Sequence, residues 1–211
     1  MKLLLYMLSV IERRVIGMAG IDAAFASEFP IIETERLLLR KPEADDIPKL
    51  YSIFSDPEAT RFYDVEPFRS VSEAEDLLES LLWRYSMEMQ IRWAICWKED
   101  KTLQGTCGFH SVEKLHNKAE IGYELHPDTW GKGVMSEALD AIIRYGFICM
   151  DLNRIEAVYL PENAASKKLL EKKGFKIEGI LRKRFVHRGI YKDAVISALL
   201  QEEYTRDRFE K

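Results

Sequence analysis

Residues 119 to 148 form the stretch that most constrains the fold of this chain. The segment AEIGYEL (119–125) has the length and apolar content of a strand, and HPDTWGKG (126–133) follows as a loop. An apolar, helix-like run then begins at Val134. The first N–H groups of a helix have no intrahelical partner, so bare backbone at this point commonly binds an anion such as phosphate. The alternative is a glycine turn that merely caps the helix.

The remaining segments predict strands and helices around this unit. Apolar periodicity predicts helices over 42–56, 70–85, 134–148 and 162–174, and strands over 34–40, 91–97, 103–112, 119–125, 154–160, 175–186 and 191–200. Ser70 and Glu73 have capping-box spacing, while Asn163 suits an N-cap and Gly174 a C-terminal cap. We expect one α/β (α+β) domain over residues 29–211, with a mixed, mostly antiparallel central sheet of six or seven strands flanked by helices. Residues 1–28 are an N-terminal extension of uncertain role.

Composition excludes several classes of protein. The 211 residues are 47% hydrophobic and 31% charged, and their net charge of −4 argues against nucleic-acid binding. No run is long enough to span a bilayer, so we expect no membrane association. Three scattered cysteines, Cys96, Cys107 and Cys149, predict buried free thiols in a reducing compartment and hence a cytoplasmic protein. No Cys or His spacing predicts a metal site.

Two familiar phosphate loops do not fit the glycine-rich loop. A Walker A loop would need glycine at position 126 and Ser or Thr at 133, where the chain has His126 and Gly133. The dinucleotide fingerprint would need a third glycine at position 136, which is Ser136. These failures count against nucleotides as the ligand.

The order of four motifs resembles that of the GNAT N-acetyltransferases, and most closely the branch of the ribosomal-protein acetyltransferases RimJ and RimL. The motifs are Ile121-Gly122-Tyr123, Trp130 to Gly133, the helix with Asn163, Ser166, Leu170 and Gly174-Phe175, and then Gly179. The resemblance spans about residues 33 to 204. Trp130 and Met135 depart from the loop of the wider superfamily, although the Rim-like branch tolerates both.

The resemblance implies acetyl-CoA as co-substrate, with its pyrophosphate on the loop backbone. The pantetheine arm would lie along the edge of 119–125, where that strand separates from its neighbour. Lys167, Lys168 and Lys172 could meet the 3′-phosphate, or they are simply solvated. The expected coenzyme-binding residues are Tyr123, Leu125, Trp130, Gly131, Lys132, Gly133, Val134, Met135, Ser136, Asn163, Ser166 and Lys172.

Acetyl transfer to an amine needs a base, and protonation of the leaving thiolate by an acid. Glu120 is the first candidate base, because many members of the resembled superfamily have a glutamate at this strand position, and Glu124 is the second. Residues four apart in a strand share one face, so both can line the same cleft. Both could instead be salt-bridge partners. Ser166 is the candidate acid, or an ordinary serine in the first turn of a helix.

The predicted function is an N-acetyltransferase acting on a primary amine, either a protein N-terminus or a small molecule, by direct attack in a ternary complex. The alternative is a non-catalytic acyl-CoA-binding sensor or scaffold. We expect the acceptor pocket between the two N-terminal helices, the loop 61–68 and the final hairpin, with Asp64 and Glu66 attracting a cationic amine. The resemblance also allows a homodimer.

Overall fold

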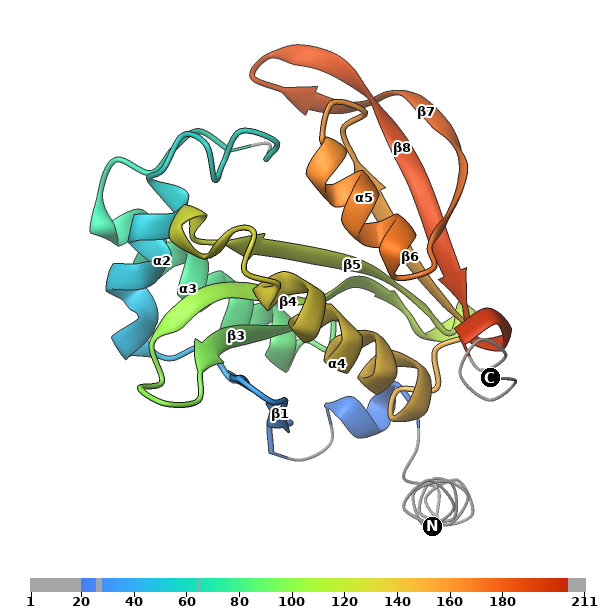
Figure 1. The fold of residues 1–211 in the computed structure, drawn as a ribbon, viewed down its shortest axis with the longest axis horizontal. Helices are drawn as coiled ribbons and strands as arrows, with labels where there is room; N and C mark the ends of the chain where they lie inside the picture. Colours follow the sequence, from blue (N-terminus) through green and yellow to red (C-terminus); the bar gives the residue numbers. More distant parts are fainter. Residues whose placement is uncertain (1–19, 26–27, 64, 205–211) are drawn as a thin grey trace.

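The computed structural model describes residues 20–25, 28–63 and 65–204. Its eight-stranded sheet has the order β1-β2-β3-β4-β5-β6-β8-β7 (Figure 1). The strands are β1 (Ile32–Glu33), β2 (Leu37–Arg40), β3 (Ile91–Trp97), β4 (Leu103–Glu113), β5 (Lys118–Leu125), β6 (Arg154–Tyr159), β7 (Lys176–His187) and β8 (Ile190–Leu200). The predicted α/β fold with a mixed, mostly antiparallel sheet is confirmed. The strand in addition to the predicted seven is the two-residue β1.

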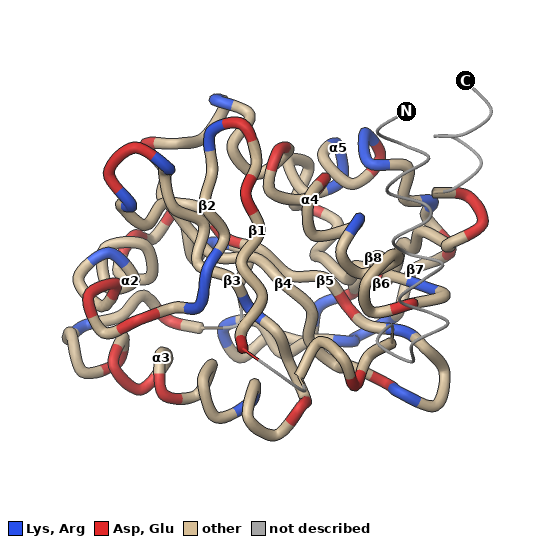
Figure 2. Tube along the Cα trace, turned by 90° about the horizontal axis from the view of Figure 1, so that it is seen from below, with Lys and Arg blue, Asp and Glu red and all other residues tan. Residues whose placement is uncertain are grey.

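Helices cover both faces of the sheet (Figure 2). The apolar stripe of α4 (Val134–Ile148) packs on one face with Trp93, Phe109 and Ile121 in the larger core. On the other face, α2 (Ile47–Phe54) and α3 (Val71–Ser86) bury Leu50, Ile53 and Leu78 in a smaller core. The remaining α-helix is α5 (Ala164–Lys172), and short 3-10 turns lie at Asp22–Ala24, Ala44–Asp46, Lys114–His116 and Pro127–Thr129.

Local sequence signals set the helix ends. The Glu73 carboxylate accepts a hydrogen bond from the Ser70 N–H at 2.9 Å, which starts α3 as the capping box predicts. Asn163 Oδ1 accepts from the Ser166 N–H at 3.0 Å at the start of α5. Gly174, at φ +90°, follows the end of that helix.

Residues 20–25 pack against the larger core, although the sequence places them in an extension. Ile21 and Ala24 are buried there, and the Gly20 N–H donates to the Cys149 carbonyl at 3.0 Å. Residues 1–19 lie outside the described part of the chain, so the boundary at residue 29 stays a prediction. No described helix has the length and apolar content needed to cross a membrane.

The neighbours β5 and β6 are parallel, and they pair over a short distance. Lys118, Ala119 and Glu120 face Arg154, Ile155 and Glu156, and no later residues of the two strands pair. Beyond Glu120, β5 keeps its antiparallel partner β4 as far as Leu125, while β6 keeps β8 as far as Tyr159. The sheet therefore opens into a V between β5 and β6, and α5 and the β7–β8 hairpin lie on the β6 side (Figure 1).

Gly146 allows α4 to approach the sheet closely. A Cβ at this position would lie 2.7 Å from Phe109 Cζ and 3.2 Å from Ile155 Cδ1, and both neighbours are fully buried. We expect Gly146→Ala to lower the free energy of unfolding by roughly 1–3 kcal/mol in urea titrations, because overpacking forces these side chains to shift. The matched control is Gly179→Ala, whose added Cβ has no atom within 4 Å. Equal stability of the two variants would contradict this account.

Candidate active site

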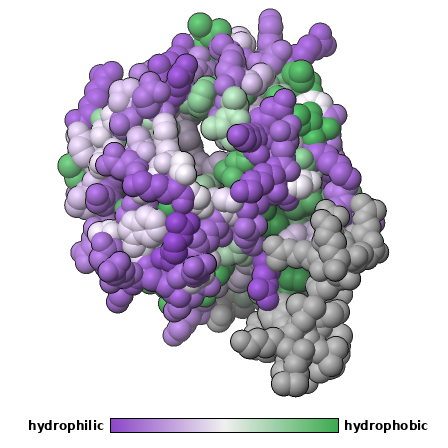
Figure 3. Space-filling view, in the orientation of Figure 1, coloured by the Kyte–Doolittle hydropathy of each residue, from purple (hydrophilic) through white to green (hydrophobic). Residues whose placement is uncertain are grey.

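A cavity of about 870 Å³ occupies the V between β5 and β6 and extends across the sheet face toward α3. The space-filling view shows an opening in this part of the surface (Figure 3). Its walls come from α3, the loop 61–68, β5, β6, α5 and the β7–β8 hairpin. The sequence predicts an acceptor pocket between α2, α3, this loop and this hairpin. Glu66 does not line the cavity, and Asp64 lies outside the described residues.

Glu120, Gly122 and Glu124 share one face of β5 and line this cavity, as their spacing predicts. On the adjacent strand they face His110, Gly108 and Thr106 in turn. A Cβ on Gly122 would lie 2.9 Å from Arg92 Nη1 and 3.2 Å from His110 Nε2. Glycine at this position therefore leaves the space that the Arg92 and His110 side chains need.

Glu124 belongs to a buried ion pair. Its carboxylate accepts hydrogen bonds from Arg92 and from the Thr106 hydroxyl, and the Glu124 and Arg92 side chains are only 5% and 10% exposed. The Tyr63 hydroxyl lies 2.6 Å from Glu124 Oε2 and 2.8 Å from the Tyr123 carbonyl oxygen. The single hydroxyl hydrogen of Tyr63 is donated to one of these two acceptors at a time, and either bond anchors the loop 61–68 to β5.

Glu120 has a different environment, in which no side chain or backbone group of the described residues donates a hydrogen bond to its carboxylate. Burial raises the pKa of Glu120, and the negative charge of Glu156 adds to that rise. His110 Nε2 lies 3.9 Å from Glu120 Oε1, beyond hydrogen-bond distance. Burial, with the charges of Arg92 and Arg84, lowers the pKa of His110 to about 4, so the imidazole is neutral at pH 7. Glu120 can therefore titrate closer to neutrality than an exposed carboxylate.

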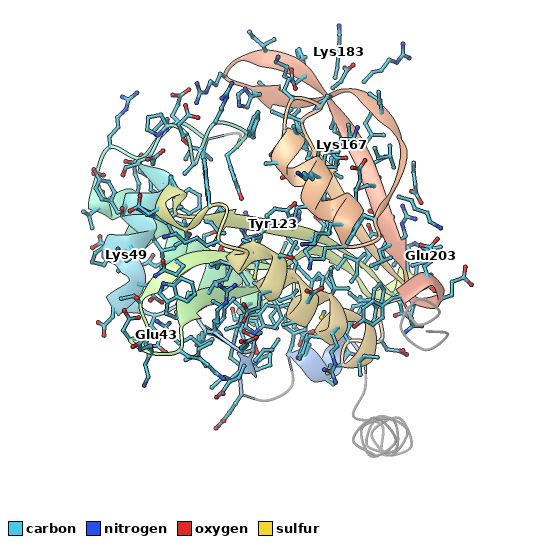
Figure 4. The ribbon with its side chains drawn as sticks, viewed as in Figure 1. Glu43, Lys49, Tyr123, Lys167, Lys183 and Glu203 are labelled. Carbon is cyan, nitrogen blue, oxygen red and sulfur yellow. The ribbon has the colours of Figure 1, made fainter. Side chains whose placement is uncertain are left out.

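Tyr123 and Tyr159 place two buried hydroxyls on the strands that form the V. Both residues line the cavity, and neither hydroxyl has a hydrogen-bond partner of acceptable geometry in the described part of the chain. Burial raises the pKa of Tyr123 to about 12, and an interaction with Ser166 partly opposes that rise. Ser166 and Asn163 line the same region from the first turn of α5. Figure 4 labels Tyr123 near the middle of the molecule, below α5.

The glycine-rich loop ends at the start of α4. Gly131 and Gly133 have φ values of +74° and +77°, and no side chain caps the helix at Gly133. The first-turn N–H groups of Val134, Met135 and Ser136 precede the first intrahelical bond, so they can face an anion. The indole N–H of Trp130 donates to the Leu125 carbonyl at 3.1 Å, which ties the loop to β5. Trp130 itself is 48% exposed.

Arg36, the residue directly before β2, stabilises this loop. Its Nη1 donates to the Lys132 carbonyl at 3.1 Å, and its Nε donates to Glu137 Oε2 at 2.7 Å. Thr34 and the Arg36 backbone N–H bind the other oxygen of Glu137. The negative charge of Glu137 in the first turn of α4 is thereby paired, which leaves the helix start free to attract an anion.

The structure does not bring Lys172 to the other predicted residues. Lys172 lies at the end of α5, beside Lys173 and Asp140 in a separate pocket of about 190 Å³. Asn163, Ser166 and Leu170 line the main cavity from this part of the chain, whereas Lys172 does not. Lys167 is exposed, 3.9 Å from Glu171, and is labelled on α5 in Figure 4.

Sequence reasoning missed Arg92, Thr106, Tyr63 and Tyr159. Arg92 could have been recognised from the sequence, since a charged residue inside the apolar run IRWAICW requires a buried partner. Of the three cysteines, Cys96 and Cys107 are buried as predicted, whereas Cys149 is only half-buried. Among the described residues, no group of three or more His, Cys, Asp or Glu side chains could hold a metal ion.

Comparison with known proteins places the chain in a family. A family model described as an acetyltransferase (GNAT) domain matches residues 36–176. The uncharacterized N-acetyltransferase p20 of Bacillus licheniformis is 43% identical over 81% of this chain and 96% of its own. A GNAT-family acetyltransferase structure from Bacillus anthracis superimposes with a TM-score of 0.74 at 29% identity, covering 82% of this chain and all of that one.

The chain belongs to the GNAT acetyltransferase family, and it is an acetyl-CoA-dependent N-acetyltransferase. It is also similar to the [ribosomal protein uS5]-alanine N-acetyltransferase of Escherichia coli (strain K12), at 33% identity over 52% of this chain and 57% of that one. The resemblance to the RimJ and RimL branch is therefore confirmed.

The Arg92–Glu124 pair predicts a large loss of stability when one partner is removed. We expect Glu124→Gln to lower the free energy of unfolding by about 3–5 kcal/mol, because Arg92 would keep a buried charge without its counter-ion. The double variant Arg92→Met/Glu124→Leu should recover most of that loss. Urea titration measures both, with Glu171→Gln at the exposed Lys167 pair as control. An unchanged stability of Glu124→Gln would show that the pair is not structural.

Proposed function

We propose that this enzyme transfers the acetyl group of acetyl-CoA to a primary amine by direct attack within a ternary complex. The observation that carries the proposal is the continuity of the cavity. It reaches the unpartnered hydroxyls of Tyr123 and Tyr159 in the V and, without interruption, the carboxylate of Glu120 on the face toward α3. Such a cavity holds a donor and an acceptor together over one reacting centre.

The coenzyme side is the V together with the glycine-rich loop. The N–H groups at the start of α4 and the backbone of Gly131 and Gly133 would hold the pyrophosphate, with Lys132 adding a positive charge. The edge of β5 beyond Glu120 has lost its β6 partner, so its backbone can bind the amides of the pantetheine arm. Lys172 lines the separate pocket at the end of α5 and not this cavity, so we assign it no coenzyme contact.

We assign Glu120 as the base and Glu124 to a structural role. Glu120 lines the cavity without a hydrogen-bond donor, and burial raises its pKa, which suits acceptance of a proton from an ammonium group near neutral pH. Glu124 has its oxygens occupied by Arg92, Thr106 and Tyr63. His110, with a pKa near 4, is too weak a base for this step.

We assign Ser166 and Tyr123 as the donors that meet the leaving sulfur. The amine nitrogen forms the new C–N bond as the C–S bond breaks, and the thiolate takes up a proton. Ser166 on α5 and Tyr123 on β5 both line the V, so either hydroxyl can donate toward that sulfur. The pKa of about 12 keeps Tyr123 protonated and able to donate.

Direct attack fits better than an acyl-enzyme. None of the three cysteines lines the cavity. Burial raises the pKa of both Cys96 and Cys107, which removes the thiolate that an acyl-enzyme would require. The amine itself is then the nucleophile, and the protein supplies its deprotonation and alignment.

Release of coenzyme A from acetyl-CoA tests the proposal on a panel of peptides beginning with Ala, Ser or Met, polyamines and aminoglycosides. We expect turnover on one class of amine. Glu120→Gln should lower kcat/KM by roughly 100-fold or more and Ser166→Ala by a smaller factor, the range typical of positioned acids and bases. Glu75→Gln, on the exposed side of α3, is the matched control.

Binding is measured separately through the fluorescence of the exposed Trp130, with Trp130→Phe identifying its signal. Binding of acetyl-CoA without turnover on any amine would favour the non-catalytic sensor. Full activity of Glu120→Gln would remove Glu120 from the base role. An absence of binding would contradict the assignment of the glycine-rich loop.

The raised pKa of Glu120 also predicts two effects of pH. Since the base must be ionised, kcat/KM should fall as pH decreases through the pKa of Glu120, and Glu120→Gln should lose this acid limb.

The ionised carboxylate is less stable in the fold than in the unfolded chain, so Glu120 favours folding at low pH and loses that contribution as pH rises through its folded pKa. Glu120→Gln should therefore gain Tm relative to wild type as pH rises from 4 to 8, measured by thermal unfolding. A constant difference would contradict the shift.

A further inference from the structure

The cavity beyond Glu120, toward α3, has mostly apolar and aromatic walls. Phe68 stacks on Phe54 with ring centroids 5.2 Å apart, and Phe54 packs edge-on against Tyr63. This region, which we call the α3 side of the cavity, continues along the last turns of α3. Its apolar wall is formed by Phe62, Val65, Phe68, Leu81, Met87 and Met89. These walls favour an acceptor whose body is apolar.

The carboxylates that line the cavity are largely neutralised. Of the three in the described part of the chain, Glu124 is paired with Arg92, and Glu88 is paired with Lys114. Glu120 is the remaining one, and the only ion pair open to it in the described part of the chain is with His110, 3.9 Å away, whose imidazole is neutral at pH 7. One free carboxylate matches one ammonium group. A second ammonium on the same acceptor would find no free counter-ion along these walls, and an unpaired charge is costly to desolvate.

Arg84 supplies an uncompensated positive charge on the same wall. It lies in the last turn of α3 and lines the cavity, and its Nε contacts the Ser80 hydroxyl at 3.3 Å. No carboxylate of the described residues forms an ion pair with its guanidinium. The field of Arg84 reaches the interior of the site, because it contributes to the lowered pKa of His110. The positive charge of Arg184, on β7, likewise acts on the site by opposing the rise in the pKa of Glu120.

We propose that the acceptor is a monoamine on an apolar body that also carries an anionic group, and that Arg84 selects this acceptor by binding the anion. The inference deepens the proposed transfer to an amine and rests on it. Glu120 receives the amine on the β5 wall of the cavity, and the planar guanidinium of Arg84 binds a carboxylate or phosphate on the α3 wall. Polyamines are excluded, since their further ammonium groups meet Arg84 instead of a carboxylate.

The test compares kcat/KM on N-terminal tetrapeptide amides that begin with Ala and carry Glu, Gln or Lys at the second or third position, together with spermidine. Wild type should prefer the Glu peptide over the Lys peptide at least tenfold at one of the two positions, and it should not use spermidine. The preference should lie in KM, and it should shrink as salt is raised. Arg84→Glu should reverse the order, and Arg84→Lys should keep it in weaker form.

Lys49→Glu is the matched control, because it makes the same kind of charge reversal on α2 at an exposed residue that points away from the cavity (Figure 4). Binding of acetyl-CoA, followed by Trp130 fluorescence, should be unchanged in all three variants. Equal use of Glu and Lys peptides, turnover of spermidine, or an unchanged order in Arg84→Glu would overturn the inference while leaving the transferase intact. Failure of every amine to react would remove the proposed function, and this inference with it.

Discussion

The site depends on the point at which β5 and β6 stop pairing. Two parallel strands that share three residue pairs and then diverge leave a row of backbone groups on each side without sheet partners. Unpaired backbone inside a protein is costly, so it must meet water, side chains or a ligand. In this molecule the Trp130 indole N–H donates to the Leu125 carbonyl, and the Tyr63 hydroxyl lies within hydrogen-bond distance of the Tyr123 carbonyl, which shares it with Glu124. The unpartnered hydroxyls of Tyr123 and Tyr159 lie in the same opening.

The divergence also sets which chemical groups can meet. Alternation along β5 directs Tyr123 toward the V and α4, whereas Glu120 and Glu124 face the side of α3. A donor in the V and an acceptor beside α3 would then approach one another across a single strand. Arg92 pairs with Glu124, whereas the nearest ion-pair partner of Glu120 is His110 at 3.9 Å. The proposed assignment of Glu120 as the base rests on this difference between the two carboxylates.

Local signals in the sequence were enough for most of the fold. The capping box at Ser70, the N-cap at Asn163 and the glycine after α5 act within one turn, so their effect is visible without knowledge of tertiary structure. The motif order likewise placed the glycine-rich loop before α4 and Glu120 on the strand that leads into it. Local patterns could not predict the register, that is, which residues face one another on neighbouring strands. Arg92 reaches Glu124 because Arg92 faces Gly108 and Gly108 faces Gly122, a relation between three strands that no single segment encodes.

Lys172 shows the same limit for helices. Its position, two turns beyond the N-cap of a short helix, suggested the coenzyme phosphate, but a helix advances about 1.5 Å per residue and so carries its two ends apart. The structure turns the start of α5 toward the V and its end toward Asp140 on α4. Arg84 and Lys172 are therefore opposite cases. Both are cationic residues near the end of a helix, yet only Arg84 ends beside the cavity. Tertiary placement, more than residue type, decides which surface charge can contact a bound acceptor. Under the proposal for Arg84, the charge of the acceptor is therefore the property that best tests this site.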